Sequence, residues 1–400
     1  MNILKKIYCR IYQGAFRAAL PVLPYREPLI LGSISDIAEE IKRKKLGKPL
    51  LVTDGFLGKS DSFKALEESM IKSGVPFAVY DKTRPNPTVE NVSEAYALYK
   101  REECNCLVAF GGGSAMDAAK ALGARVAYKG APLKRLKGNL KIFRKLPPLF
   151  AIPTTAGTGS EVTLTAVITD EVKKHKYTMN SFPLIPRYAV LDPKVTYTLP
   201  PHLTSTTGMD ALTHAVEAFI GRSTSKETRR LSKEAVKLVI ENVETAYNEP
   251  TDFAARKNML EAAYKAGIAF SKSYVGYIHA VAHSLGGQLN IPHGLANSVL
   301  LPVVLEEYGE KAHKKLYELA LFAGVADEND GMKKGAEKFI SKIKELNKNM
   351  NIPETLKGIE EKDIDIMARH ADKEGNPLYP VPVLMNKEEL KKFYYAVMER

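Results

Sequence analysis

The 400-residue sequence is poor in cysteine and in long apolar runs, and each shortage excludes a class of protein. Its three cysteines, Cys9, Cys104 and Cys106, are too few for a disulfide framework in a chain of this length. They fit a reducing compartment, and we expect the cytoplasm. No apolar stretch is long enough to cross a bilayer, so we expect no membrane span.

The net charge of +12 comes from basic side chains that are scattered among acidic ones. The densest basic stretch, residues 134–145, contains one aromatic side chain, Phe143. A nucleic-acid surface needs basic groups interleaved with stacking aromatics. We therefore expect no nucleic-acid partner and interpret this stretch as a solvated loop.

The first 25 residues resemble a secretory signal only superficially, because four basic residues are interleaved with the apolar ones. Helical spacing instead predicts a basic amphipathic helix that forms an N-terminal extension. Docking on this protein or on a second copy of it is favoured over binding to a membrane surface. The apolar positions are Ile3, Leu4, Ile7, Tyr8, Ile11, Tyr12 and Phe16, and the basic ones are Lys5, Lys6, Arg10 and Arg17.

The first half of the chain alternates short β-type runs with amphipathic helical stretches, a pattern typical of an α/β domain with a parallel sheet. Beyond Thr198–His202, where two prolines interrupt the chain, β-type runs almost vanish and long helical patterns follow. The sequence thus predicts an α/β domain over residues 1–199, including the extension 1–25, and an all-helical domain over 200–400. The expected strands are 50–53, 77–80, 107–110, 150–152 and 189–191; the expected helices are 37–45, 62–73, 89–100, 115–124, 208–220, 226–248, 252–271, 276–286, 310–323 and 331–346.

Four of the eight histidines lie in two short segments of the helical half. Asp210 and His214 are four residues apart, as are His279 and His283, and His293 follows ten residues later. Four-residue spacing places two side chains on one face of a helix. Either pair alone is compatible with ordinary packing. Together, on otherwise apolar helices where unpartnered polar groups are costly, they predict a shared divalent cation.

A glycine-rich turn follows the expected strand 107–110, with Gly112, Gly113 and Ser114 opening a helix. Such a turn lets the backbone approach a phosphate at a helix N-terminus. It is also compatible with a tight strand-to-helix turn in which Ser114 and Asp117 form a capping pair. Both interpretations stay open from these residues alone.

A second turn, residues 153–160, follows the strand 150–152 and offers the hydroxyls of Thr154, Thr155 and Thr158. Two such turns after parallel strands favour one extended ligand such as a dinucleotide. Asp54 directly follows the strand 50–53. At this position its carboxylate can bond both hydroxyls of an adenosine ribose and would repel a 2′-phosphate. NAD(H) is therefore favoured over NADP(H).

These segments together resemble the iron-containing (group III) alcohol dehydrogenase family. The resemblance runs from about Pro28 to the C-terminus and rests on GGGSAMDAAK, PTTAGTGSEVT, GMDALTHAVEAF and HAVAHSLGGQLNIPHG. It implies metal ligation by Asp210, His214, His279 and His293, with His283 as a catalytic residue beside the nicotinamide. The cofactor contacts that it implies are Asp54, Gly112, Gly113, Ser114, Thr154, Thr155, Thr158 and Lys176.

The implied reaction is the interconversion of primary alcohols or diols and aldehydes by hydride transfer, with a small-molecule alcohol or aldehyde as substrate. Ionising a hydroxyl as weakly acidic as water at neutral pH costs roughly 12 kcal/mol. A histidine cannot cover that gap unaided, whereas a divalent cation that binds the alkoxide can. The ligand types tolerate Fe²⁺ and Zn²⁺ alike, and the resemblance favours Fe²⁺. A homo-oligomer such as a dimer is expected.

Three alternatives stay open. A zinc polyol dehydrogenase resembling glycerol dehydrogenase would use three protein ligands, so a fourth candidate, His293, speaks against it. A lyase resembling dehydroquinate synthase would need a basic pocket beside the histidines, and no matching cluster is evident. A non-enzymatic metal- or nucleotide-binding protein would not need a second phosphate loop.

Overall fold

The computed structural model describes residues 1–171 and 175–399 and divides the chain into two compact units. One unit is Pro24–Leu199, and the other joins Met1–Leu23 to Pro200–Arg400. The division after residue 199 coincides with the predicted one, but the N-terminal segment belongs to the helical unit. Within the described ranges, no helix is both long and apolar enough to cross a membrane.

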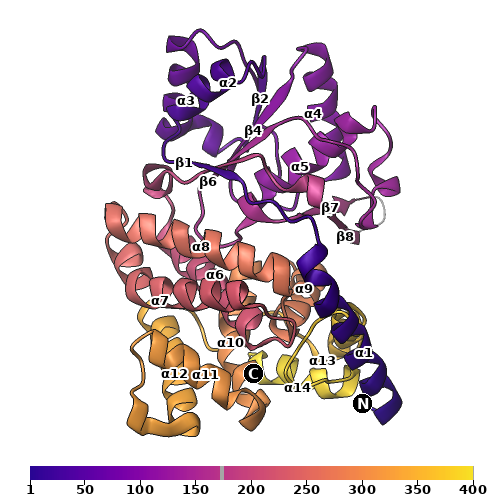
Figure 1. Cartoon of the computed structure of the whole chain (residues 1–400), viewed down its shortest axis with the longest axis vertical. Helices are drawn as coiled ribbons and strands as arrows, with labels where there is room; N and C mark the ends of the chain where they lie inside the picture. Colours follow the sequence, from indigo (N-terminus) through magenta and orange to yellow (C-terminus); the bar gives the residue numbers. More distant parts are fainter. Residues whose placement is uncertain (172–174, 400) are drawn as a thin grey trace. The chain divides into compact units, whose positions relative to one another are not determined.

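A six-stranded parallel sheet forms the centre of the α/β unit (Figure 1), as the alternating pattern predicts. Its strand order is β1-β9-β6-β4-β2-β3, and every neighbouring pair is parallel. The edge strand β1 was not predicted. The strands are β1 (Leu29–Leu31), β2 (Pro49–Val52), β3 (Ala78–Tyr80), β4 (Cys106–Gly111), β6 (Leu149–Pro153) and β9 (Tyr188–Val190).

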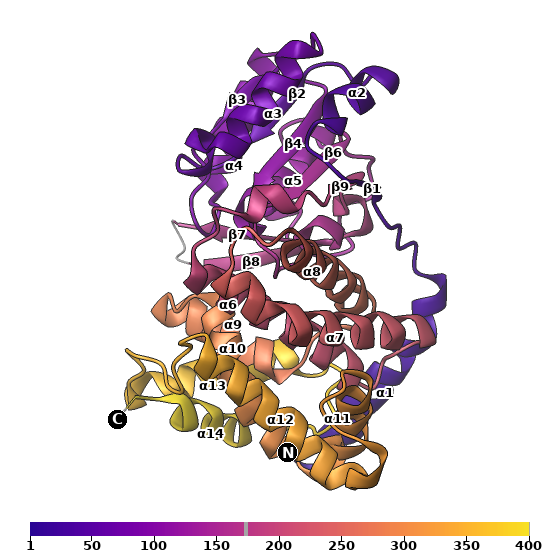
Figure 2. The ribbon, with the colours of Figure 1, turned by 90° about the vertical axis from the view of Figure 1, so that its left-hand side faces the viewer.

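Helices cover both faces of this sheet, so each strand is apolar on both sides. Leu50 and Leu107 point to the face covered by α4 (Val89–Arg101) and α5 (Gly113–Ala127). The alternate residues Leu51 and Val108 point to the face covered by α2 (Asp36–Arg43) and α3 (Asp61–Lys72). Figure 2 shows the strands side by side between these layers. The two cores hold the sheet rigidly, with its loops at the strand ends.

A second, three-stranded sheet was missed by the sequence analysis. It contains β5 (Gly138–Asn139), β7 (Thr165–Asp170) and β8 (His175–Asn180) in the order β5-β8-β7, with β7 and β8 antiparallel. The alternation of burial along β7 is incomplete, which explains why the period-two signal was weak.

The second unit is helical, as predicted, apart from an isolated bridge between Leu356 and Met398. Helix α10 was missed because it is buried on all sides and contains Pro302, so its sequence shows no amphipathic period. Helices α13 and α14 were also missed. The helices are α6 (Pro201–Ile220), α7 (Lys226–Asn248), α8 (Phe253–Ser273), α9 (Tyr277–Leu289), α10 (His293–Tyr308), α11 (Glu310–Phe322), α12 (Gly331–Asn349), α13 (Glu361–Gly375) and α14 (Lys387–Val397).

The predicted N-terminal helix exists as α1 (Ile3–Ala19), but its grouping with the α/β domain was wrong. The amide of Gln13 donates to the carbonyls of Pro377 and Tyr379. The guanidinium of Arg10 donates to the carbonyls of two residues just beyond, Val381 and Pro382. These bonds attach α1 to the loop between α13 and α14.

In the α/β unit, a fully buried lysine joins α5 to the chain that follows β6. The Lys120 ammonium donates to the hydroxyls of Ser160 (3.0 Å) and Thr163 (2.9 Å) and to the carbonyls of Thr163 and Thr165. Asp117 accepts from the Ser160 hydroxyl and from the Val167 amide, so it does not form the capping pair with Ser114. Burial lowers the pKa of Lys120 to about 8 and raises that of Asp117 to about 6. This network connects the two glycine-containing turns.

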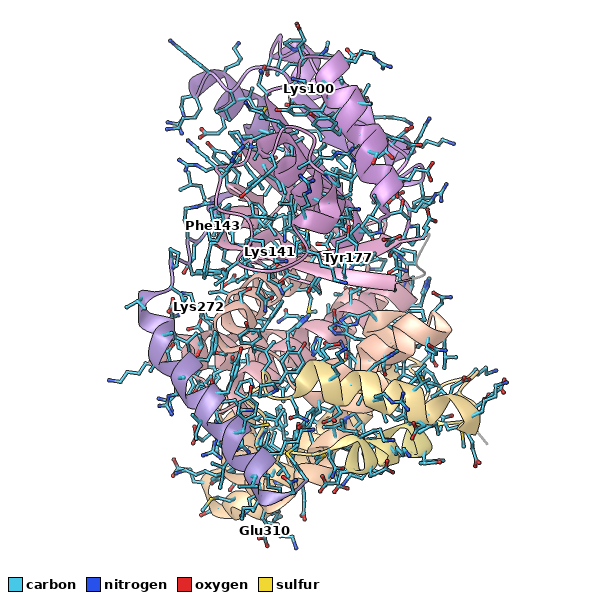
Figure 3. The ribbon with its side chains drawn as sticks, turned by 90° about the vertical axis from the view of Figure 1, so that its right-hand side faces the viewer. Lys100, Lys141, Phe143, Tyr177, Lys272 and Glu310 are labelled. Atoms are coloured by element: carbon cyan, nitrogen blue, oxygen red, sulfur yellow. The ribbon has the colours of Figure 1, made fainter. Side chains whose placement is uncertain are left out.

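We expect Lys120→Met to destabilise the protein by about 3–5 kcal/mol, because it leaves several buried acceptors without a donor and Asp117 without its cation. Urea denaturation followed by circular dichroism measures the loss. Lys100→Met, at the exposed end of α4 (Figure 3), is the matched control and should change stability by less than about 0.5 kcal/mol. Equal effects of the two substitutions would contradict the structural role of Lys120.

Candidate functional site

Three helices of the helical unit bring the four predicted metal ligands together. Asp210 and His214 lie on α6, His279 lies on α9, and His293 is the first residue of α10. One potential ligand atom from each side chain falls within 4.8 Å of the others. Metal binding itself stays a prediction, but the geometric condition for it is met.

The approach of α10 to α6 depends on Gly294. A Cβ at this position would lie 2.6 Å from the carbonyl oxygen of Thr206, so a larger residue would push the helices apart. The close approach brings the His293 Nε2 atom to 3.5 Å from the Asp210 Oδ1 atom. The glycine after His293 therefore sets the position of this ligand.

Glu217, one helical turn after His214, orients His279. Its Oε2 atom lies 2.6 Å from His279 Nδ1, and its oxygens also accept the amides of Gly276 (2.8 Å) and Ile278 (2.9 Å) at the start of α9. Burial raises the pKa of Glu217 to about 7, while these backbone bonds oppose the increase. The carboxyl group thus fixes both the helix terminus and the imidazole.

Asn297 shows which way the lone pairs of the cluster point. Its amide nitrogen lies 2.6 Å from Asp210 Oδ1, 3.2 Å from His279 Nε2 and 3.1 Å from His293 Nε2. An amide nitrogen can only donate, so the bonded imidazole nitrogens carry lone pairs and the hydrogen of His279 is on Nδ1. Two amide hydrogens cannot satisfy three acceptors. A cation can, so the donor set fits a divalent metal.

The electrostatic surroundings keep two of the imidazoles neutral, as metal ligands must be. Burial, reinforced by His214 and His293, holds the pKa of His279 well below its usual value. Burial also lowers the pKa of His293 to about 4, although Asp210 opposes this shift. His214 stacks on Phe270 with the ring centroids 4.2 Å apart, which fixes its ring plane.

His283, one helical turn after His279 on α9, lies beside the cluster but is not one of its four members. Its ring stacks on His293 at 5.1 Å, and its Nδ1 atom lies 2.6 Å from Glu374 Oε1. The Tyr379 hydroxyl donates to the same carboxylate oxygen at 2.7 Å. Burial acts to lower the pKa of His283, but Glu374 outweighs it and the net shift is upward. Its side chain is 41% exposed, so its other nitrogen remains available for chemistry.

In the α/β unit, seven of the eight predicted cofactor residues follow three neighbouring strands, and the eighth, Lys176, lies on β8 of the second sheet. Asp54 comes after β2, the glycines after β4, and Thr154–Thr158 after β6, so all three loops lie at the carboxyl edge of the sheet. The chain passes from β2 to the edge strand β3 and then returns to β4 on the other side of β2. Ligands of open parallel sheets bind at such a switch point.

The two turns pack against each other. A Cβ at Gly112 would lie 3.3 Å from the Thr155 side chain, and one at Gly113 would lie 3.3 Å from Thr158, so a larger residue at either position would crowd these threonines. No side chain caps the N-terminus of α5, and the Thr155 hydroxyl is buried without a hydrogen-bond partner among the described residues. Free helix N–H groups and an unpaired hydroxyl fit an anionic group such as a phosphate.

Asn86, which the sequence analysis missed, connects two other predicted contacts. Its backbone N–H donates to the Ser114 hydroxyl at 3.3 Å, and its side-chain oxygen accepts from the Lys176 ammonium at 3.0 Å. Burial lowers the pKa of Lys176. Thr154 donates its backbone amide to the carbonyl of Gly111, while Asp54 Oδ1 accepts the amides of Phe56 and Leu57.

Some of the other site residues that were not predicted could have been found from the sequence pattern, and others could not. Glu217 and Asn297 follow His214 and His293 at helical spacing, three and four residues later, so their positions carried a usable signal. Glu374 comes from a distant helix, and no local pattern connects it to His283. Tertiary packing alone brings these two together.

Comparison with known proteins finds two matching family models. "Iron-containing alcohol dehydrogenase" matches residues 30–193, and "Fe-containing alcohol dehydrogenase family, C-terminal" matches residues 204–398. The chain is 38% identical over 371 residues to alcohol dehydrogenase 4 of Saccharomyces cerevisiae, covering 91% of this chain and 95% of that one.

Solved structures of similar proteins agree with this family assignment. A crystal structure of 1,3-propanediol oxidoreductase superposes with a TM-score of 0.90 at 34% identity, covering 94% of this chain and 99% of that one. Sulfoacetaldehyde reductase from Bifidobacterium kashiwanohense, solved in complex with NAD⁺, gives a TM-score of 0.84 at 29% identity, covering 93% and 98%. The similarity thus extends over both units of the chain.

We expect Glu217→Gln to weaken metal binding by about 10- to 100-fold, because the amide no longer provides the charged acceptor for the His279 Nδ1 hydrogen. Competition with a chromophoric chelator measures the dissociation constant. Glu241→Gln, on the exposed side of α7, is the control and should leave it unchanged. Circular dichroism confirms that both variants fold, and unaltered metal affinity in the folded Glu217→Gln variant would rule out the orienting role.

Proposed function

Because the chain belongs to the iron-containing alcohol dehydrogenase family, we propose that Asp210, His214, His279 and His293 hold Fe²⁺ and that the loops after β2, β4 and β6 bind NAD(H). The family relationship makes the protein an oxidoreductase that interconverts alcohols and aldehydes. The identity of the metal, the choice of cofactor and the role of each residue are our proposals.

The convergence of four ligand atoms within 4.8 Å is the observation that carries the metal assignment. A bound divalent cation supplies a Lewis acid, which makes ionisation of an alcohol hydroxyl accessible at neutral pH. The protein contributes rigidity. Glu217 holds His279 in the tautomer that presents Nε2, and the stacking of His214 on Phe270 fixes the His214 ring plane.

His283 is the proposed proton carrier. Glu374 engages its Nδ1 atom, so Nε2 is the atom left to exchange a proton with the substrate hydroxyl or with water. The Tyr379 hydroxyl holds Glu374 in place. An imidazole whose pKa is raised by a neighbouring carboxylate is well suited to accept a proton near neutral pH.

At the metal centre, Zn²⁺ is the alternative to Fe²⁺. The proposed cofactor is NAD(H). Asp54 carries the cofactor preference, because its carboxylate would repel a 2′-phosphate. The related sulfoacetaldehyde reductase was solved with NAD⁺, which supports the same choice here. Gly112, Gly113, Ser114, Thr154, Thr155, Thr158 and Lys176 complete the proposed binding site.

The alternatives are less well supported. The presence of His293 in the cluster argues against the three-ligand site of a zinc polyol dehydrogenase. The relatives named above are oxidoreductases, which disfavours a lyase.

We further propose a cytoplasmic homodimer. The three cysteines are free and buried, which fits a reducing compartment. The edge strand β1 exposes the apolar residues Leu29 and Ile30, which a second copy could cover.

Two histidine substitutions separate ligation from proton transfer. His279→Ala should remove the metal and the activity together, whereas His283→Ala should keep the metal and lower turnover by about 100-fold or more. Metal analysis of anaerobically prepared protein and steady-state aldehyde reduction with NADH provide the two measurements. His370→Ala, on the exposed face of α13, is the control. Loss of metal in His283→Ala would reassign it as a ligand, and a metal-loaded, active His279→Ala would overturn the ligand set.

Asp54→Asn tests the cofactor assignment, because it keeps the Oδ1 acceptor for the Phe56 and Leu57 amides and removes only the charge. We expect the ratio of kcat/KM for NADPH to that for NADH to rise about tenfold, which corresponds to about 1.4 kcal/mol. Asp61→Asn, at the fully exposed start of α3, should not change the ratio. If Asp54→Asn does not change it either, Asp54 does not select the cofactor.

A further inference from the structure

Helix α1 packs on the helical unit through its polar side. Lys5 pairs with Asp372 on α13 at 3.1 Å, and Arg10 and Gln13 donate to backbone carbonyls of the following loop. The side chain of Cys9, between them, is buried. The ring of Phe16 also meets that of Tyr274, with the centroids 4.8 Å apart. Docking therefore uses Cys9, Phe16 and the polar groups of α1, and leaves most of its apolar residues out of the contact.

The apolar side of α1 faces away from the protein. Residues at positions 3, 4, 7, 8, 11 and 12 recur one and two turns apart, so they form one continuous face along the helix. Figure 3 shows α1 along the margin of the helical unit with its side chains extended. The exposed fractions are 72% for Ile3, 76% for Leu4, 50% for Ile7, 57% for Tyr8, 68% for Ile11 and 42% for Tyr12.

Basic residues border this apolar face on both sides. At 100° per residue, Lys5 falls at one border and Lys6, Arg10 and Arg17 at the other. Residues 1–23 contain no aspartate or glutamate. The exposed surface of α1 is therefore an apolar strip flanked by positive charge, and two tyrosines lie within it.

We propose that α1 attaches the protein to anionic lipid membranes, with the helix lying in the plane of the interface. The aliphatic side chains would enter the boundary between headgroups and acyl chains, where tyrosine is also favoured. The exposed basic residues Lys6 and Arg17 would meet the negative surface. The sequence alone favours docking on the protein itself or on a second copy of it over a membrane. The structure shows that docking leaves the apolar face uncovered, so the two are compatible.

Charge distinguishes a membrane from a second copy of the chain as the occupant. Pairing α1 with α1 of a second copy would bring two sets of four basic residues together without an acidic residue from either segment. Like charges at close range disfavour that arrangement, whereas an anionic bilayer neutralises them. The proposal does not depend on the metal or on the cofactor, since α1 carries none of their residues.

Co-sedimentation of the full chain with phosphatidylcholine vesicles, with and without phosphatidylglycerol, tests the proposal. We expect binding at least about tenfold tighter to the anionic vesicles, and weaker binding as salt is raised. Ile7→Ser combined with Ile11→Ser should weaken it at least about tenfold. Lys6→Gln should weaken it about fivefold on anionic vesicles only. The control variant, Ile71→Ser combined with Phe143→Ser, alters exposed apolar residues of the α/β unit and should bind like the wild type.

Two results would overturn the proposal. One is wild-type binding to anionic vesicles that is no tighter than that of the folded Ile7→Ser, Ile11→Ser variant. The other is a wild-type oligomer, seen by light scattering, that dissociates in this variant, because a second copy would then cover the face. Circular dichroism verifies folding, and alcohol dehydrogenase activity should be equal in all variants, which separates this proposal from that of the catalytic site.

Discussion

The structure of the helical unit depends on one electrostatic constraint: several lone pairs are directed at a single point inside an apolar helical core. Asp210 Oδ1, His279 Nε2 and His293 Nε2 surround one amide group that has only two hydrogens to offer. Buried acceptors without donors cost free energy, so this arrangement is unfavourable unless a cation completes it. Glu217 and Gly294 maintain it, the first through the His279 tautomer and the second through the approach of α10 to α6.

The α/β unit has a different structural role, which is to present backbone N–H donors to an anion. Parallel strands place three loops on one edge, the glycines allow the two turns to touch, and the buried Lys120 connects α5 to the segment after β6. The uncapped N-terminus of α5 and the unpaired Thr155 hydroxyl then remain for a phosphate. A buried charge provides this rigidity, which explains why Lys120 lies fully buried among the hydroxyl and carbonyl oxygens of Ser160, Thr163 and Thr165.

Much of this could be predicted from the sequence, because the signals were local. Strong β-type runs identified five strands of the parallel sheet. Four-residue spacing singled out Asp210 with His214, and His279 with its neighbour His283, before any fold was known. Elements whose sequence shows no periodic apolar pattern were not predicted. Helix α10 is buried all round, and β1 has only three residues. Glu374 and Asn86 were missed because their partners, His283 and Lys176, are about ninety residues away in sequence. The placement of α1 was wrong because its polar face, not its apolar face, makes the contact.

The most direct test is X-ray absorption at the iron edge of anaerobically prepared, iron-loaded protein. The account predicts one iron per chain whose scattering shells require three imidazoles and a carboxylate oxygen, as expected for His214, His279, His293 and Asp210. Iron that shows fewer imidazole shells, or shows sulfur ligation, would contradict it.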